Sequence, residues 1–306
     1  MAKILIATEK PFSQVAVDGI REVADKAGYE LALLEKYTEK KELLEAVHDA
    51  DALIVRSDKV DAEVAEAGKN LKIVVRAGAG FDNLDLEALK ARNIVAMNTP
   101  GQNANSVAEL VFGMLVYGVR NFFNGTSGTE LKGKKLGILA FGNVGRNVAR
   151  IAKGFGMEVC AYDAFCPKEV IEQAGVHAAD CQDELFEQCD IVSLHIPATP
   201  ETRQSINYQL VGKMKKGGIL VNTARKEVID EAGLIRLMQE RPDLKYLTDI
   251  KPDMDAEFAA QFPGRYFATP KKMGAQTAEA NVNAGIAAAN QIVGYLEQGI
   301  TKFKLN

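Results

Sequence analysis

The sequence is poor in histidine and tryptophan and has no long apolar run. Its 306 residues include three histidines, His48, His177 and His195, and no tryptophan. No stretch reaches the roughly 18 consecutive apolar residues of a membrane helix, and the apolar start of the chain is too short for a signal peptide. We therefore expect a protein of the cytoplasm with no membrane helix.

Cysteine is also scarce, and its spacing is uninformative. The four cysteines, Cys160, Cys166, Cys181 and Cys189, form no C-x-x-C pair and have no histidine at zinc spacing. A disulfide framework is not expected in a chain of this length. We predict free thiols in a reducing compartment and no metal site.

No excess of positive charge is present. The 37 Lys and Arg residues are opposed by 41 Asp and Glu residues, which gives a formal net charge of −4. Such a chain has no general attraction to nucleic acid or to an anionic membrane. An anionic ligand would have to be held by a few placed cations, and a small molecule is the expected partner.

The length and the periodicity predict two domains of the same kind. At about 150 residues per domain, the length suggests two domains. Short apolar runs alternate with helical patterns, as in parallel strands covered by helices on both faces. This pattern predicts an α/β fold with two doubly wound Rossmann-like domains, parallel sheets and a cleft between them. The runs are Ile4–Ala7, Glu30–Leu34, Ala52–Arg56, Lys72–Val75, Ile94–Asn98, Leu136–Phe141, Glu158–Tyr162, Ile191–His195, Gly218–Asn222, Lys245–Thr248 and Arg265–Ala268.

The domain boundary is placed at a turn followed by a long helix. Thr99-Pro100-Gly101 is a turn signal, and Asn105-Ser106 supplies helix-capping groups. The helical stretch at 277–296 has no domain of its own, so we expect it to return to the first domain. The prediction is a discontinuous substrate-binding, catalytic domain of residues 1–100 plus 277–306 and a nucleotide-binding domain of residues 101–276. The alternative is a simple C-terminal helix on the second domain.

A glycine loop stands between a predicted strand and a predicted helix. It reads Ala140-x-Gly142-x-x-Gly145, with alanine at the first position of the G-x-G-x-x-G pattern. The second glycine lets the backbone approach a pyrophosphate, and the third lets helix and strand pack closely. Alanine at the first position is tolerable if the turn keeps φ negative. The loop predicts dinucleotide binding at a helix N-terminus.

An aspartate follows at the expected distance. Asp163 ends the next predicted strand, 21 residues after Gly142 (163 − 142). An acid at this place accepts from the ribose hydroxyls and repels a 2′-phosphate. Ala164 and Phe165 follow it, with no arginine to favour NADP, so the predicted cofactor is NAD. The alternative is a structural glycine turn beside a solvated aspartate.

Further motifs lie at the ends of the predicted strands, where open α/β sheets place ligands. Together they resemble the D-isomer-specific 2-hydroxyacid dehydrogenases, in the family's order and over nearly the whole chain. They are Val55-Arg56-Ser57, Arg76-Ala-Gly-Ala-Gly-Phe-Asp-Asn83, Asn98-Thr-Pro-Gly-Gln-Asn-Ala-Asn-Ser-Val-Ala-Glu109, Leu194-His-Ile-Pro197 and Val221-Asn-Thr-Ala-Arg225.

The resemblance implies an activity and an oligomeric state. It implies NAD-dependent oxidation of 3-phospho-D-glycerate to 3-phosphohydroxypyruvate, a step of serine biosynthesis. It also implies a homodimer formed through the nucleotide-binding domain. Longer members carry a C-terminal regulatory domain for which this sequence has no room, so serine feedback through such a domain is not expected.

The resemblance also assigns roles to residues. Arg225 matches the arginine that grips the substrate carboxylate and polarises the keto oxygen, and a bidentate guanidinium suits both tasks. Backbone N–H groups of Ala77, Gly78 and Ala79 would hold the same carboxylate. Arg56, Ser57 and Asn103 would face the distal, phosphorylated end of the substrate. The residues implied on the cofactor side are Gly142, Asn143, Val144, Gly145, Asp163, His195, Pro197, Thr223, Ala224, Asp249 and Gly274.

At one place the sequence departs from the family pattern. The usual acid–base histidine, directly after a Thr-Pro pair, is missing, since the chain reads Thr269-Pro-Lys-Lys-Met-Gly-Ala275. The assisting glutamate is missing too, because the family's spacing of 29 residues from Arg225 lands on Met254. Asp253, Asp255 and Glu257 could replace it only with a differently shaped loop.

We therefore expect a lysine in the histidine's role. Like charge and desolvation near Arg225 would lower its pKa towards a useful range, and a glutamate would raise that pKa again. Counting from Thr269 selects Lys271, whereas counting back from Gly274 selects Lys272, and we favour Lys272. The alternative is that both are solvated loop lysines.

Two rival functions stay open. One is a dehydrogenase for another D-2-hydroxy acid, such as glycerate. The other is a non-catalytic protein that binds NAD(H) as a signal.

Overall fold

The computed structural model describes residues 2–306 and divides the chain into two compact units. Unit 1 comprises the chain up to Asn103 together with Gln276–Asn306, and unit 2 comprises Ala104–Ala275. The predicted boundaries differ from these by three residues at the first (100 against 103) and one at the second (276 against 275). Within residues 2–306, no helix is long and apolar enough to cross a membrane.

Unit 1 is built on a five-stranded parallel sheet in the order β2-β1-β3-β4-β5. Helices cover both faces, because each face of the sheet carries its own cluster of buried side chains. The strands are β1 (Lys3–Thr8), β2 (Glu30–Glu35), β3 (Ala52–Val55), β4 (Ile73–Arg76) and β5 (Val95–Asn98). The helices are α1 (Gln14–Lys26), α2 (Lys40–Val47), α3 (Ala62–Ala67), α4 (Leu86–Ala91) and α12 (Ala278–Gln298).

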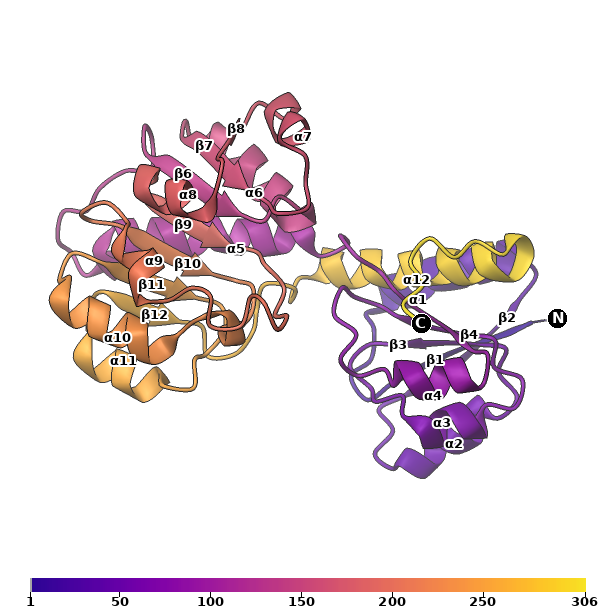
Figure 1. The fold of residues 1–306 in the computed structure, drawn as a ribbon. Coiled ribbons are helices and arrows are strands. Elements are labelled where there is room, and N and C mark those ends of the chain that lie inside the picture. Colours follow the sequence, from indigo (N-terminus) through magenta and orange to yellow (C-terminus); the bar gives the residue numbers. More distant parts are fainter. Residues whose placement is uncertain (1) are drawn as a thin grey trace. The chain divides into compact units, whose positions relative to one another are not determined.

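The C-terminal helix α12 packs beside α1, far from it in the sequence (Figure 1). Two glycines allow this close approach. A Cβ on Gly19 would lie 2.6 Å from the Cδ1 of Ile286, and one on Gly285 would lie 2.9 Å from the Cδ1 of Ile20. The helix begins after Thr277, whose side chain accepts from the N–H of Ala280. Unit 1 is therefore discontinuous in sequence.

Unit 2 is built on a seven-stranded parallel sheet in the order β12-β11-β10-β9-β6-β7-β8. Its strands are β6 (Lys135–Leu139), β7 (Glu158–Tyr162), β8 (His177–Ala178), β9 (Ile191–Leu194), β10 (Ile219–Asn222), β11 (Lys245–Thr248) and β12 (Tyr266–Ala268). Its helices are α5 (Ala104–Val119), η1 (Asn121–Phe123), α6 (Asn143–Gly154), α7 (Lys168–Gln173), α8 (Gln182–Gln188), α9 (Tyr208–Gly212), η2 (Lys226–Val228), α10 (Glu231–Glu240) and α11 (Asp255–Gln261).

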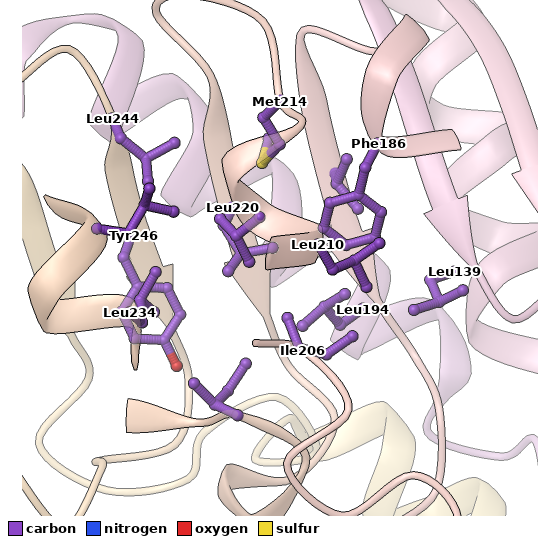
Figure 2. Close-up of a cluster of buried hydrophobic side chains, with 14 of the residues drawn as sticks. Leu139, Phe186, Leu194, Ile206, Leu210, Met214, Leu220, Leu234, Leu244 and Tyr246 are labelled. Carbon is purple, nitrogen blue, oxygen red and sulfur yellow. The ribbon is translucent and has the colours of Figure 1, made fainter. Parts of the chain in front are cut away.

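Buried side chains lie on both faces of this second sheet. One cluster joins β9, β10 and β11 to α8, α9, α10 and α11 (Figure 2), and the other joins the sheet to α5 and α6. The predicted α/β class with two parallel sheets is confirmed. Strand β8 is not among the predicted strands, because two residues at the edge of a sheet are too few to show a pattern. The cleft stays a prediction.

The first helix of unit 2, α5, begins at Ala104, so Asn105 and Ser106 lie in its first turn and do not cap it. The helix is apolar on almost every side. Its most exposed line runs through Asn105, Glu109 and Gly113. A Cβ added to Gly113 would have no other atom within 4 Å, so this side of the helix is open.

Candidate active site

The predicted cofactor residues of unit 2 lie at one edge of its sheet, the carboxyl ends of the strands. Backbone bonds join neighbouring strand ends there. Ala140 donates to Tyr162, His195 to Leu139, and Asp249 to Asn222, at 2.8, 2.9 and 3.0 Å. This is the edge at which open α/β sheets bind ligands.

The glycine loop opens α6 and leaves room in front of it. Gly142 is the N-cap of α6, and a Cβ added to it would have no other atom within 4 Å. Asn143 and Val144 form the first turn of the helix. A Cβ on Gly145 would lie 2.3 Å from the carbonyl oxygen of Ala140, so helix and strand touch at this glycine. Open space before a helix N-terminus suits a pyrophosphate.

Ala140 departs from the conformation expected of it. Its φ is +79°, so the condition under which alanine was expected to be tolerated, a negative φ, is not met. The N–H of Ala140 donates to the carbonyl oxygen of Tyr162, and its own carbonyl oxygen packs against Gly145. These two contacts hold the residue in a left-handed conformation. A non-glycine residue in this region costs about 1–2 kcal/mol.

Asp163 lies beside the glycine loop after β7. Its Oδ2 accepts the N–H of Phe141 at 2.7 Å, and its Oδ1 accepts those of Phe165 and Cys166 at 2.8 and 3.0 Å. These bonds fix the carboxylate next to the loop. The side chain is partly buried, and Phe165 is 96% exposed.

His195 is held between two hydroxyl groups. Its Nε2 lies 2.9 Å from the Oγ of Ser193 and its Nδ1 lies 3.5 Å from the Oγ1 of Thr223. Burial lowers the pKa of His195 to about 3, so the ring is neutral at physiological pH. Pro197, two residues on, is exposed. A neutral ring fits a contact with a cofactor better than a general acid at neutral pH.

The loop that carries Arg225 is shaped by a fully buried asparagine. The Oδ1 of Asn222 accepts the N–H of Ala224 at 2.9 Å, and its Nδ2 donates to the carbonyl oxygen of Arg225 at 3.0 Å. Arg225 is partly buried, and its Nη1 donates to the carbonyl oxygen of Ala224 at 2.9 Å. The backbone around the predicted catalytic arginine is thus fixed from the end of β10.

The lysine-bearing loop follows β12. Both Lys271 and Lys272 are exposed, and Gly274 is buried. The carboxylate of Asp249, itself fully buried, accepts the N–H groups of Met273 and Gly274, each at 2.7 Å. Asp249 therefore contacts the loop that the sequence analysis proposed for proton transfer.

The acidic candidates for the missing glutamate have other partners. Asp253 pairs with Lys226, and Asp255 accepts from Tyr266 and Lys251 at 2.8 and 2.9 Å. Glu257 is exposed on α11. Met254, at the family's spacing, is partly buried against the core.

In unit 1, Arg56 lies at the end of β3 with its guanidinium engaged. Its Nη1 donates to the carbonyl oxygens of Lys10 and Pro11 at 2.9 and 3.0 Å, and its Nη2 donates to the Oδ1 of Asn281 at 2.7 Å. Burial lowers its pKa, and the charge of Asp58 opposes this shift. These bonds use three of the five N–H groups of a guanidinium.

The turn next to Arg56 is held by a buried carboxylate. Asp58 accepts the N–H of Glu9 at 2.7 Å and the hydroxyl of Tyr37 at 3.0 Å. Burial and the charge of Asp58 raise the pKa of Tyr37. Ser57 is exposed between Arg56 and Asp58.

The predicted carboxylate loop lies at the end of β4. The N–H of Ala77 donates to Val55 and that of Gly78 to Arg76, both at 2.8 Å, so Ala79 is the remaining donor of the three predicted. A Cβ on Gly78 would lie 1.5 Å from the Nη1 of Arg76, so a side chain there would displace this guanidinium. Asn103, the last residue of this part of unit 1, is partly buried.

A cavity of about 770 Å³ in unit 1 lies away from these strand ends, between β1, β2 and α2. Its walls include Leu5, Leu34, Leu44 and His48. None of its lining residues was predicted to contact substrate or cofactor.

Sequence reasoning missed the buried polar residues that hold these loops. Asn222 lay inside a quoted motif without a role, and Asp58 directly follows another. The available signal was a polar residue at the end of a fully apolar strand, where burial obliges it to find partners.

Comparison with known proteins identifies relatives over the whole chain. Residues 112–260, within unit 2, match the D-isomer specific 2-hydroxyacid dehydrogenase, NAD binding domain. The chain is 38% identical to a D-3-phosphoglycerate dehydrogenase of Methanocaldococcus jannaschii, over 83% of this chain and 51% of that protein. It is 43% identical to a hydroxypyruvate reductase of Thermotoga maritima, over 67% of this chain and 70% of that protein.

A solved structure resembles the whole chain. The NAD+-bound 3-phosphoglycerate dehydrogenase of Entamoeba histolytica matches with a TM-score of 0.87 and 50% identity, over 100% of this chain and 98% of that one. This chain spans about half the length of several of the curated relatives it matches, 51% and 56% in two archaeal D-3-phosphoglycerate dehydrogenases.

Proposed function

This chain belongs to the D-isomer-specific 2-hydroxyacid dehydrogenase family, and from that premise we propose that it oxidises 3-phospho-D-glycerate to 3-phosphohydroxypyruvate with NAD+. One observation carries the choice of substrate: the likeness, over the whole chain, to the 3-phosphoglycerate dehydrogenase of Entamoeba histolytica. The sequence resemblance to this family is thereby confirmed. Unit 1 would hold the substrate and unit 2 the cofactor.

The glycine loop fits the cofactor. The open space in front of Gly142 lies at the N-terminus of a helix of 12 residues, where free N–H groups and the helix dipole favour a pyrophosphate. Asp163, fixed beside the loop, offers carboxylate oxygens to ribose hydroxyls. Bound NAD+ would supply the hydride acceptor.

The reaction needs a cation and a base, and this chain offers both. Arg225 would bind the substrate carboxylate and stabilise the negative charge that develops on the oxygen as hydride leaves C2. Neutral Lys272 would accept the hydroxyl proton at Nζ, so that the C–H bond loses its electron pair to the cofactor while the O–H bond loses its proton to the lysine. Because Lys272 is exposed, the desolvation that lowers its pKa would come from the ligands that join it.

A second candidate is the reduction of unphosphorylated hydroxypyruvate. Two observations favour it: the 43% identity to a hydroxypyruvate reductase and the three bonds that already engage Arg56, the predicted phosphate contact. In the first candidate, Arg56 shares its remaining N–H groups, and Ser57 its hydroxyl, with the phosphate.

The test is NADH oxidation measured by absorbance with 3-phosphohydroxypyruvate and with hydroxypyruvate. We expect turnover of the phosphorylated acid, with a KM that rises about tenfold or more in Arg56→Ala, as the loss of a charge-assisted contact predicts. Lys272→Ala should abolish turnover and leave NADH binding intact. Activity in Lys272→Ala with a dead Lys271→Ala would transfer the role to Lys271, and activity in both would overturn the lysine mechanism.

A third outcome would contradict enzyme activity altogether. NADH binding without turnover of any 2-keto acid would identify a protein that senses NAD(H). Turnover of hydroxypyruvate alone, unaffected by Arg56→Ala, would select the second candidate.

A homodimer and a cytoplasmic location complete the proposal. Helix α5 supports dimerisation through unit 2, because its exposed line is open around Gly113, where a second helix can approach closely. The cytoplasmic location stays a prediction from the sequence.

A further inference from the structure

A buried charge at the end of β11 has its partners in one loop. The side chain of Asp249 is fully buried, and both of its oxygens accept backbone N–H groups at 2.7 Å, Oδ1 from Met273 and Oδ2 from Gly274. Bonds from N–H groups to a carboxylate are short and strong, and they offset the cost of removing the charge from water. The carboxylate of Asp249 therefore binds the segment that follows β12 and holds it in place.

A hydroxyl group holds the other end of the same segment. The Oγ1 of Thr269, a buried residue, lies 2.8 Å from the carbonyl oxygens of Asp249 and Lys271 and 3.0 Å from the Oδ1 of Asp249, so its single proton is shared among three acceptors. Thr269 and Asp249 thus meet at the start of the segment, and the N–H groups that Asp249 accepts directly follow Lys272.

The packing around Gly274 shows how tightly the loop sits on the carboxylate. A Cβ on Gly274 would lie 2.9 Å from the Oδ2 of Asp249 and 3.2 Å from the Cγ2 of Val107. Only a residue without a side chain brings its N–H this close. The loop is closed against Asp249 at a point two residues after Lys272.

We propose that Asp249 is a positioning residue, which fixes the main chain directly after Lys272 so that the lysine meets the substrate hydroxyl. The proposal rests on the proposed function, in which Lys272 accepts the proton. Proton transfer needs the two heavy atoms within hydrogen-bond reach, and a misplacement of about 1 Å can cost about 100-fold in rate.

The role differs from the one that the resemblance implied for Asp249. The resemblance implied a contact with the cofactor, and a residue in that role acts on cofactor affinity. A residue that anchors the loop acts on the proton-transfer step and on the exchange of the loop's own amide hydrogens. The two roles therefore have different experimental signatures.

Asp249→Asn tests the proposal, because the amide keeps the shape but turns one acceptor into a donor that faces an N–H group. We expect hydrogen exchange of the 270–276 segment to accelerate about tenfold or more, kcat to fall about 10- to 100-fold, and the Kd of NADH to change less than about twofold. In the Lys272→Ala background, Asp249→Asn should still accelerate the exchange of this segment, which reports the anchoring without reliance on turnover.

Two further variants keep the test independent of folding defects. Gly274→Ala pushes the loop off the same carboxylate and should show the same signature. Asp190→Asn is the matched control: its Oδ2 accepts the N–H of Lys135 at 2.8 Å, at the opposite end of the sheet, and its kcat should equal that of the wild type.

Two results would overturn the proposal. One is normal exchange at 270–276 in Asp249→Asn, whatever its NADH affinity, and the other is accelerated exchange with a kcat equal to that of the wild type. Failure of the proposed function looks different, because the wild type itself would then turn over no 2-keto acid, whatever the exchange of the loop.

Discussion

At Gly142 the fold tolerates a side chain, whereas a bound cofactor would not. Its φ of −77° suits any residue, and a Cβ there would have no other atom within 4 Å. The fold alone does not require glycine at this position. The space matters only if a ligand approaches the backbone.

We therefore predict that Gly142→Ala keeps the free energy of unfolding within about 0.5 kcal/mol and weakens NADH binding about tenfold or more. Denaturant unfolding and a fluorescence titration measure the two quantities. Gly154→Ala, at the other end of α6 and equally open, is the control and should leave NADH binding unchanged. Equal NADH affinity in both variants would contradict the placement of the pyrophosphate.

Ala140 shows the opposite case, a residue under backbone strain. Because its φ is +79°, Ala140→Gly should raise the free energy of unfolding by about 1 kcal/mol, after the greater freedom of glycine in the unfolded chain is subtracted. Ala152→Gly, in the buried interior of α6, should lower it. Urea unfolding compares the two, and a loss of stability in Ala140→Gly would show that the turn is not strained.

At the scale of elements, the ends of β9, β10 and β11 carry the polar side chains that shape the site. Ser193, Asn222 and Thr248 are fully buried, and their partners lie in the loops that follow these strands. Parallel strands end at one edge, so side chains distant in sequence form one bonded layer. This layer positions His195, Arg225 and Asp249.

The neutral His195 in this layer makes stability depend on pH. Its pKa is about 3 in the folded chain and about 6.5 when unfolded, so the unfolded state binds the extra proton between these values. Stability should therefore fall as the pH drops below about 6.5, with a slope of up to about 1.4 kcal/mol per pH unit from this residue. Urea unfolding at pH 7.5, 6.5 and 5.5 measures the slope.

His195→Gln should remove that slope. His177→Gln, an exposed histidine in the same unit, is the control and should retain it. An unchanged slope in His195→Gln would place the pH dependence elsewhere.

At the scale of the molecule, the proposed dimer depends on one open position of α5. Gly113→Lys places a long charged side chain there, where no atom of the same chain lies within 4 Å. Lysine also favours a helix over glycine by about 0.5–1 kcal/mol, so the monomer should not lose stability. We expect wild type at twice 33.2 kDa and the variant at 33.2 kDa in light scattering.

A dimeric Gly113→Lys would contradict assembly through this face. Glu109→Lys, one turn earlier on the same exposed line, tests whether charge alone explains a monomer. This substitution reverses the charge at position 109 and leaves the size of the side chain similar.

The sequence by itself determined the α/β class, the parallel strands and the glycine loop before a helix. These features follow from local patterns: apolar runs of strand length, helical spacing and the distance from Gly142 to Asp163. The family resemblance rested on the motifs that stand at the ends of the predicted strands. The absence of the family histidine was equally visible, because the sequence shows a lysine directly after Thr269-Pro270.

Only the tertiary structure decided the φ of Ala140, the engagement of Arg56 and the role of Asp249 as an anchor. Each depends on atoms brought together from distant parts of the chain: Tyr162 and Gly145 for Ala140, Asn281 for Arg56, and Gly274 for Asp249. Spacing in the sequence carries no information on such contacts. A buried polar group must find partners, but the fold decides which ones.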